Sequence, residues 1–191
     1  MKLFNPKEVI KAFFIAILFT FHFIAFGQKL NKPITDKFTN DSLRFTSFEN
    51  IAFDNPPGAG GLYLFCSFIK GNNGIVCLNL QAVAFQADFT AFFGAGENSV
   101  MIKLADNSIL KLTDIRGTLA VPAEIQNNGY GSGLSSAHFL YALSSQDISR
   151  IEASQVTDFR VMSNKQTMDF ALKPKGSDMF AKLLALIVNA K

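Results

Sequence analysis

The stretch LYLFCSFIKGNNGIVCLNLQAVAF, residues 62–85, decides the fold class of this chain. Two runs rich in aromatic, aliphatic and β-branched residues flank the segment KGNNG. Asn and Gly are the residues that tight β-turns prefer, because they tolerate left-handed backbone angles. The pattern therefore predicts a β-hairpin, and it is the clearest hairpin signal in the sequence.

This hairpin contains both cysteines of the chain, Cys66 and Cys77. With Asn72–Asn73 as a two-residue turn, side-chain alternation puts both thiols on one face, one diagonal step apart. A shifted loop puts them directly opposite each other, where the Cα separation suits a disulfide. The apolar neighbours on that face suit two buried free thiols equally well. The sequence leaves the disulfide and the buried thiols both open, and it does not favour a metal or redox site.

Further strand patterns lie on both sides of this hairpin. Residues 43–53 carry apolar side chains in imperfect alternation, which favours a strand ahead of the loop NPPGAGG. The remaining predicted strands form a hairpin over residues 99–115, a single strand over 137–143, and a third hairpin that flanks NKQ at 164–166. No internal repeat is present.

Two helices are expected near the C-terminus. SSQDISRI, residues 144–151, predicts one or two helical turns with a serine cap and Asp147 in the first turn. KPKGSDMFAKLLALIVNAK, residues 173–191, predicts a terminal helix that Ser177 or Asp178 can cap. Its apolar stripe is broad, so we expect this helix to press against a sheet.

Residues 43–191 therefore predict a single α+β domain. The expected architecture is an antiparallel sheet or partly open barrel of about eight strands with a C-terminal capping helix. The order of the elements, strands before a final helix, resembles the pleckstrin-homology-like architecture. Resemblance of fold implies no particular activity.

The N-terminus has the three parts of a secretory signal peptide. Lys2, Lys7 and Lys11 precede an apolar run over residues 12–26, and Gly27 offers a small residue at the cleavage site. The ending FGQ resembles that of signal peptides from exported bacterial proteins. We expect residues 1–27 to be a signal peptide, which implies a periplasmic or extracellular location. The alternative is an uncleaved anchor, and only then do we expect membrane attachment.

Cleavage after Gly27 changes the charge of the chain. It removes three of the 18 basic and one of the 15 acidic residues, so the net charge falls from +3 to about +1. A protein that binds nucleic acid usually carries a clear basic excess. We therefore expect no nucleic-acid partner. Residues 28–42 are polar and predict an N-terminal arm.

Few residues offer reactive chemistry. His138 is the only histidine outside residues 1–27. No G-x-S-x-G elbow, phosphate-binding glycine loop or zinc-ligand spacing is present. We therefore predict no catalytic residues, metal or cofactor. A hydrolase that uses His138 or a pair of carboxylates is the alternative, and the available carboxylates are Glu49, Asp54, Asp88, Glu97, Asp114, Glu124 and Asp158.

The long loop over residues 126–136 is the best candidate for a contact surface, since long Gly-rich loops in compact domains usually have a role. Its candidate contact residues are Asn127, Asn128, Tyr130, Ser132 and the nearby His138. The leading functional prediction is an exported, non-enzymatic binding or structural module for an unknown protein or small molecule. A carrier of an apolar ligand is the third hypothesis.

Overall fold

The computed structural model describes residues 29–35, 42–54, 61–85, 98–113, 134–162 and 167–190. The strands are β1 (Ile34–Thr35), β2 (Ser42–Phe45), β3 (Glu49–Asp54), β4 (Leu62–Gly71), β5 (Val76–Phe85), β6 (Ser99–Leu104), β7 (Ile109–Thr113), β8 (Leu134–Leu143), β9 (Val156–Met162) and β10 (Thr167–Ala171). The helices are α2 (Ser145–Ala153) and α3 (Pro174–Val188). The signal peptide predicted over residues 1–27 lies outside the described residues.

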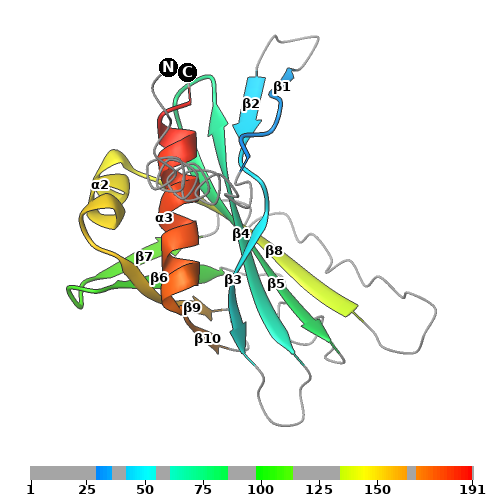
Figure 1. Cartoon of the computed structure of the whole chain (residues 1–191), viewed down its shortest axis with the longest axis vertical. Helices are drawn as coiled ribbons and strands as arrows, with labels where there is room; N and C mark the ends of the chain where they lie inside the picture. The colour runs from blue at the N-terminus through cyan, green and yellow to red at the C-terminus, as the bar shows by residue number, and fades with distance from the viewer. Residues whose placement is uncertain are drawn as a thin grey trace, which may run out of the picture.

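The strands form two antiparallel sheets (Figure 1). One has six strands in the order β1-β2-β4-β5-β8, with β3 also paired to β4. The other has four strands in the order β10-β9-β6-β7. Strands β7 and β8 approach each other on one side and β3 and β10 on the other, without pairing. The result is a partly open barrel with a C-terminal helix, so the predicted α+β class is confirmed.

The core lies between the two sheets, and α3 contributes to it from one side. The ring of Phe180 in α3 lies between two aromatic rings, one from each sheet. Its centroid is 5.1 Å from that of Phe68 in β4 and 5.4 Å from that of Phe159 in β9. The predicted apolar stripe of the helix is buried as expected, at Phe180, Leu183, Leu184 and Ile187. No helix among the described residues is long and apolar enough to cross a membrane.

The segment over residues 43–53 is two strands, where the sequence favoured one. β2 and β3 both pair with the same edge of β4, and the regular strand pairing is interrupted between them. At the break the Thr46 hydroxyl accepts a hydrogen bond from the Phe68 amide at 2.9 Å. A second irregularity follows at Ile51, which is an extra residue in the pairing of β3 with β4. These two breaks explain the imperfect alternation of the sequence.

The predicted arm over residues 28–42 is in part a sheet edge. Leu30 forms an isolated bridge with Thr46, and Ile34 of β1 pairs with Leu43 of β2. The Asn31 amide donates a hydrogen bond to the Phe45 carbonyl at 2.8 Å. The arm therefore extends the six-stranded sheet.

The register of the β4–β5 hairpin differs from both registers expected from the sequence. The loop has three residues because Gly74 adopts a left-handed φ of 78° and adds to Asn72 and Asn73. The Gly71 amide then donates to the Ile75 carbonyl at 3.1 Å, and this closes the loop. Loop length sets the register of the whole hairpin.

This register separates the two cysteines. Cys66 pairs with Leu80 and Cys77 with Ile69, so the two thiols point to opposite faces of the sheet. Cys66 is buried in the core, and Cys77 is half-buried on the outer face. Both thiols are free, so the disulfide alternative is wrong for this structure, and only Cys66 is the buried core thiol that the other alternative expected.

The two thiols should differ strongly in reactivity. Burial raises the pKa of Cys66, and the negative charge of Glu49 raises it further, while partial burial alone raises the pKa of Cys77. Because the thiolate is the nucleophile, we expect iodoacetamide to modify Cys77 slowly at pH 7 and faster as the pH rises. We expect Cys66 to react at least about a hundredfold more slowly, since it requires unfolding of the core.

Peptide mapping by mass spectrometry after timed alkylation measures both rates. Unfolding in denaturant is the control, because it should equalise them. Equal rates in the folded protein, or an intact mass two daltons below that of the reduced chain, would contradict this arrangement.

Helix α3 is tied to the sheets at both ends. It begins at Pro174, so neither Ser177 nor Asp178 caps it as expected. The buried Ser177 hydroxyl instead donates to the Val156 carbonyl of β9 at 2.6 Å. At the other end, Lys70 of β4 donates to the carbonyls of Val188 and Ala190 at 2.9 and 2.8 Å. A cation at the carboxyl end of a helix satisfies free carbonyls and complements the helix dipole.

Candidate binding groove

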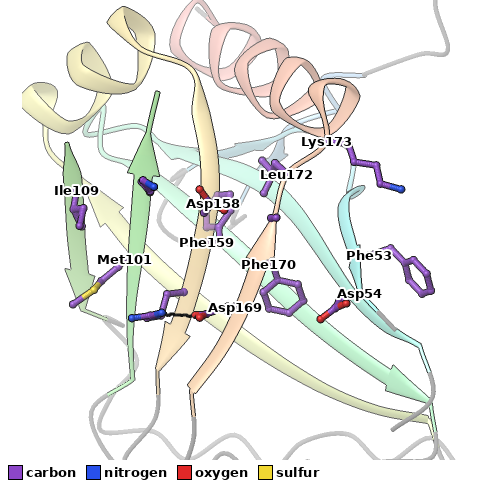
Figure 2. Close-up of a pocket in the computed structure, with 13 residues that line it drawn as sticks. Phe53, Asp54, Met101, Ile109, Asp158, Phe159, Asp169, Phe170, Leu172 and Lys173 are labelled. Carbon is purple, nitrogen blue, oxygen red and sulfur yellow. Dashed lines mark hydrogen bonds and ion pairs between the residues drawn. The ribbon is translucent and has the colours of Figure 1, made fainter. Parts of the chain in front are cut away.

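A groove of about 690 Å3 crosses the outer face of the four-stranded sheet and reaches the end of β3 (Figure 2). Its volume lies within the usual range of ligand sites. The apolar residues that line it include Met101, Ile109, Phe170 and Leu172. Its charged residues are Lys103, Arg160, Lys173, Asp54, Asp158 and Asp169. The groove therefore combines apolar surface with equal numbers of cations and carboxylates.

Strand alternation positions most of these charges. The core-facing residues of β9 are apolar, and the residues between them point outward. Outward-facing Asp158 lies directly opposite Lys103 of β6, and Arg160 lies directly opposite Asp169 of β10. Opposite charges therefore face each other across two neighbouring strand pairs, an arrangement that favours this register.

The Arg160–Asp169 pair is the best-defined feature of the groove (Figure 2). Nε and Nη2 of Arg160 each donate to one carboxylate oxygen of Asp169 at 2.7 Å. The hydrogen bonds from Arg160 lower the pKa of Asp169, and those bonds raise the pKa of Arg160 in turn. Both side chains are more than half exposed, so the pair adds little to stability. Its effect is to hold two opposite charges in fixed positions.

The edge of β10 that faces β3 has no paired strand among the described residues. The Leu172 amide donates to the Thr157 carbonyl of β9 at 2.8 Å. Because successive residues of an antiparallel strand point their amides to opposite sides, the amides of Asp169 and Ala171 point away from β9. In Figure 2, Phe170 and Asp54 lie between β10 and β3. The groove therefore borders an edge with free backbone donors and acceptors.

The structure brings together two of the carboxylates named from the sequence. Asp54 and Asp158 both line the groove, whereas Glu49 accepts a hydrogen bond from Ser47 at 2.8 Å elsewhere on β3. Asp88, Glu97, Asp114 and Glu124 lie outside the described residues. A general acid needs a raised pKa, and the third groove carboxylate, Asp169, has a lowered one. Within the described residues, no group of three or more His, Cys, Asp or Glu side chains could hold a metal ion.

Most of the predicted contact loop lies outside the described residues. Asn127, Asn128, Tyr130 and Ser132 lie outside the described residues. His138 is on β8 and pairs with Gln81 of β5. Its ring nitrogen Nε2 lies 3.1 Å from the side-chain amide nitrogen of Gln81. It is half-buried on the outer face of the six-stranded sheet and does not line the groove.

Arg160 and Asp169 are not among the site residues predicted from the sequence. Arg160 is five residues before Lys165, the middle of NKQ, and Asp169 is four residues after it, so a hairpin with NKQ as its loop does not place them opposite each other. In the structure the register differs by one residue and pairs the two, and their opposite charges favour this register. Nothing in the sequence indicates that β3 lies beside this hairpin.

No family model, curated protein or solved structure matches this chain. The resemblance to the pleckstrin-homology-like architecture therefore stays a prediction from the order of the elements. Any functional assignment depends on the groove itself.

Proposed function

We propose that this chain is an exported, non-enzymatic binding module whose groove accepts an extended polypeptide segment. One observation carries the proposal: the groove borders the edge of β10 with which no described strand pairs, where backbone amides and carbonyls point away from the sheet. An extended peptide can add to such an edge as a further strand, and its main-chain hydrogen bonds supply affinity. Its entry requires β3 and β10 to separate, because the two strands approach each other more closely than two strand spacings.

The lining of the groove suits a polypeptide better than other ligand classes. Three cations and three carboxylates leave no net charge, so the groove offers no field for a phosphate backbone. The chain contains no Trp, the side chain best suited to stacking on a sugar. The groove is lined by apolar side chains and by side chains of both charges. A peptide carries apolar and charged side chains that can complement this lining.

The geometry also sets the pattern of the peptide. Alternate side chains of an added strand lie on opposite faces of the sheet. Those opposite Phe170 would point toward the opening between β10 and β3, where apolar residues are favoured. Those opposite Asp169 would lie on the outer face, where a basic side chain can approach the carboxylate. A segment that alternates apolar and basic residues is therefore the best fit.

Export is the second part of the proposal, and it rests on residues 1–27. The intact mass of the protein recovered from the cell envelope tests it. A chain that begins at Gln28 supports export with cleavage. A full-length chain in the cytoplasm would contradict it.

The substitution Ala171→Pro tests strand addition. Proline removes the outward-pointing amide of residue 171 and leaves the Leu172 bond to β9 intact, as proline does on edge strands. The probe is a fluorescein-labelled hexapeptide that alternates leucine and lysine, and the readout is fluorescence anisotropy. We expect the dissociation constant to rise about tenfold or more, since the lost hydrogen bond leaves a peptide carbonyl unpaired.

Two controls accompany this measurement. Ala171→Ser keeps the amide and should bind as the wild type does. A peptide with the same composition but three leucines followed by three lysines should bind more weakly, because it cannot separate the two side-chain types between two faces. If Ala171→Pro binds as tightly as Ala171→Ser, or if the wild type binds both peptides equally, strand addition at β10 is wrong.

A further inference from the structure

A small pocket of about 300 Å3 lies at the end of the six-stranded sheet that is remote from the groove. β2, the β4–β5 turn and the C-terminal end of α3 meet there, at the top of Figure 1. The polar side chains in its lining are those of Ser42, Arg44, Lys70 and Asn72, and none of the described residues that line it is acidic. We call it the basic pocket.

Two cations face each other directly in the basic pocket. Arg44 of β2 pairs with Lys70 of β4, and alternation places both on the same face as Phe68, toward α3. Like charges at directly opposite positions of a strand pair are destabilising. The direct pairs of charged residues beside the groove join opposite charges instead. An anion between Arg44 and Lys70 would replace their repulsion by two attractions.

Lys70 is only partly satisfied within the protein. Its ammonium donates to the carbonyls of Val188 and Ala190 at 2.9 and 2.8 Å. These carbonyls carry no formal charge, and the two bonds use two of the three N–H groups of the ammonium. Lys70 can therefore still attract an anion and donate one more hydrogen bond.

Arg44 is the stronger indication of a ligand. It is half-buried, yet it makes no hydrogen bond or ion pair within the part of the chain that the structure describes. A guanidinium has five N–H donors in a planar fork, and leaving them unpaired in partly buried surroundings costs free energy. Local arrangements that oppose stability are expected mainly at functional sites.

The rim of the basic pocket is held in place without a ligand. The Ser42 hydroxyl and the side-chain amide of Asn72 are hydrogen-bonded at 2.6 Å, which joins β2 to the β4–β5 turn. Lys70 likewise joins β4 to the end of α3. Little further ordering is needed when a ligand enters, and such preorganisation favours affinity.

We propose that the basic pocket binds the phosphate group of a small phosphate monoester. Its two positive charges match the charge of about −2 that a phosphate monoester carries near pH 7. The Arg44 guanidinium can donate two parallel hydrogen bonds to phosphate oxygens, and Lys70 adds a compact positive charge. The volume suits a small molecule, since it lies at the lower end of the range for ligand sites.

Isothermal titration calorimetry of the full chain with phenyl phosphate tests this proposal. Phenyl sulfate is the matched control ligand, because it has a similar shape but only one negative charge. We expect phenyl phosphate to bind at one site per chain, and phenyl sulfate to bind at least about tenfold more weakly. Equal or tighter binding of inorganic phosphate would overturn the monoester in favour of free phosphate.

The substitution Arg44→Gln removes the cation that lacks a partner. We expect it to weaken phenyl phosphate binding at least about tenfold, since a charge-assisted pair of hydrogen bonds is lost. Arg150→Gln is the matched control and should bind as the wild type does, because Arg150 is also half-buried but lies on α2, outside the pocket. Without ligand, Arg44→Gln should melt at the wild-type temperature or above it, because the repulsion from Lys70 is relieved.

Three results would overturn the proposal. One is equal affinity for phenyl phosphate in the wild type and in Arg44→Gln, or equal affinity for the two phenyl ligands. Another is a clearly lower melting temperature of Arg44→Gln, because Arg44 would then have a structural partner. The third concerns Asp41, which precedes Ser42 in the sequence and lies outside the described residues. If phenyl phosphate binds only to Asp41→Asn, Asp41 is the anion that compensates Arg44.

This test is independent of the peptide experiment. Strand addition at β10 can fail while phosphate binding holds, and the reverse is equally true, because the two sites share no described lining residue.

Discussion

Replacing Phe180 with alanine is expected to lower the free energy of unfolding by about 3–5 kcal/mol. The side chain is fully buried, and its ring meets Phe68 and Phe159 edge-to-face at interplanar angles of 65° and 63°. The ring contacts one aromatic residue of each sheet. Its removal loses apolar burial and two aromatic contacts, and it leaves a cavity between elements that do not pair with each other.

Denaturant unfolding followed by circular dichroism measures this loss. Lys182→Ala is the matched control, because Lys182 is exposed on the same helix and its truncation should change the stability by less than about 0.5 kcal/mol. Phe180→Leu should recover part of the loss, since it fills some of the cavity. A loss below about 1 kcal/mol for Phe180→Ala would contradict the role of this ring.

Replacing Gly176 with alanine is expected to destabilise the protein by about 1–3 kcal/mol or more. Alanine is the better helix former by about 1 kcal/mol, so helix propensity alone predicts the opposite sign. A Cβ at this position would collide with the carbonyl oxygen of Ile51, the extra residue of β3. Because that atom belongs to the backbone, the helix or the strand must move.

Thermal and denaturant unfolding of Gly176→Ala should both show the loss. Lys175→Ala, at the exposed preceding position, is the control and should have little effect. The shape of the groove should change as well. β3 ends in Asp54 and α3 follows Lys173, and both of these residues line the groove. A rise in stability for Gly176→Ala would show that the helix does not lie this close to β3.

Local patterns predicted most of the individual elements. The three hairpins form where alternating apolar residues flank Asn, Gly or polar turns. Helix α2 begins as expected, with the Ser144 hydroxyl accepting from the Asp147 amide and the Asp147 carboxylate accepting from the Ser144 amide. These signals were readable because each depends on residues only a few positions apart.

The predictions of the hairpin register and of the start of α3 were wrong for one reason. In each case two local arrangements of the chain have nearly the same energy. One left-handed residue, Gly74, lengthens a turn and moves Cys77 to the opposite face from Cys66. Pro174 starts α3 three residues before Ser177, whose hydroxyl bonds to β9 instead of capping the helix. In both cases the competing local arrangements differ little in energy, and contacts with the rest of the fold decide between them.

The sequence by itself determined the α+β class, the hairpins, and the helix stripe that is buried against the sheets, because periodicity and turn chemistry act along the chain. Only the tertiary structure decided that β10 is the last described strand of one sheet, that β3 lies across from it, and that Asp54 joins Asp158 and Asp169 in one groove. The reason is physical: strands of different sheets meet through the packing of the core and α3, and no hydrogen-bond ladder or turn links β3 to β10. The candidate site therefore arises from contacts between segments more than one hundred residues apart in the sequence.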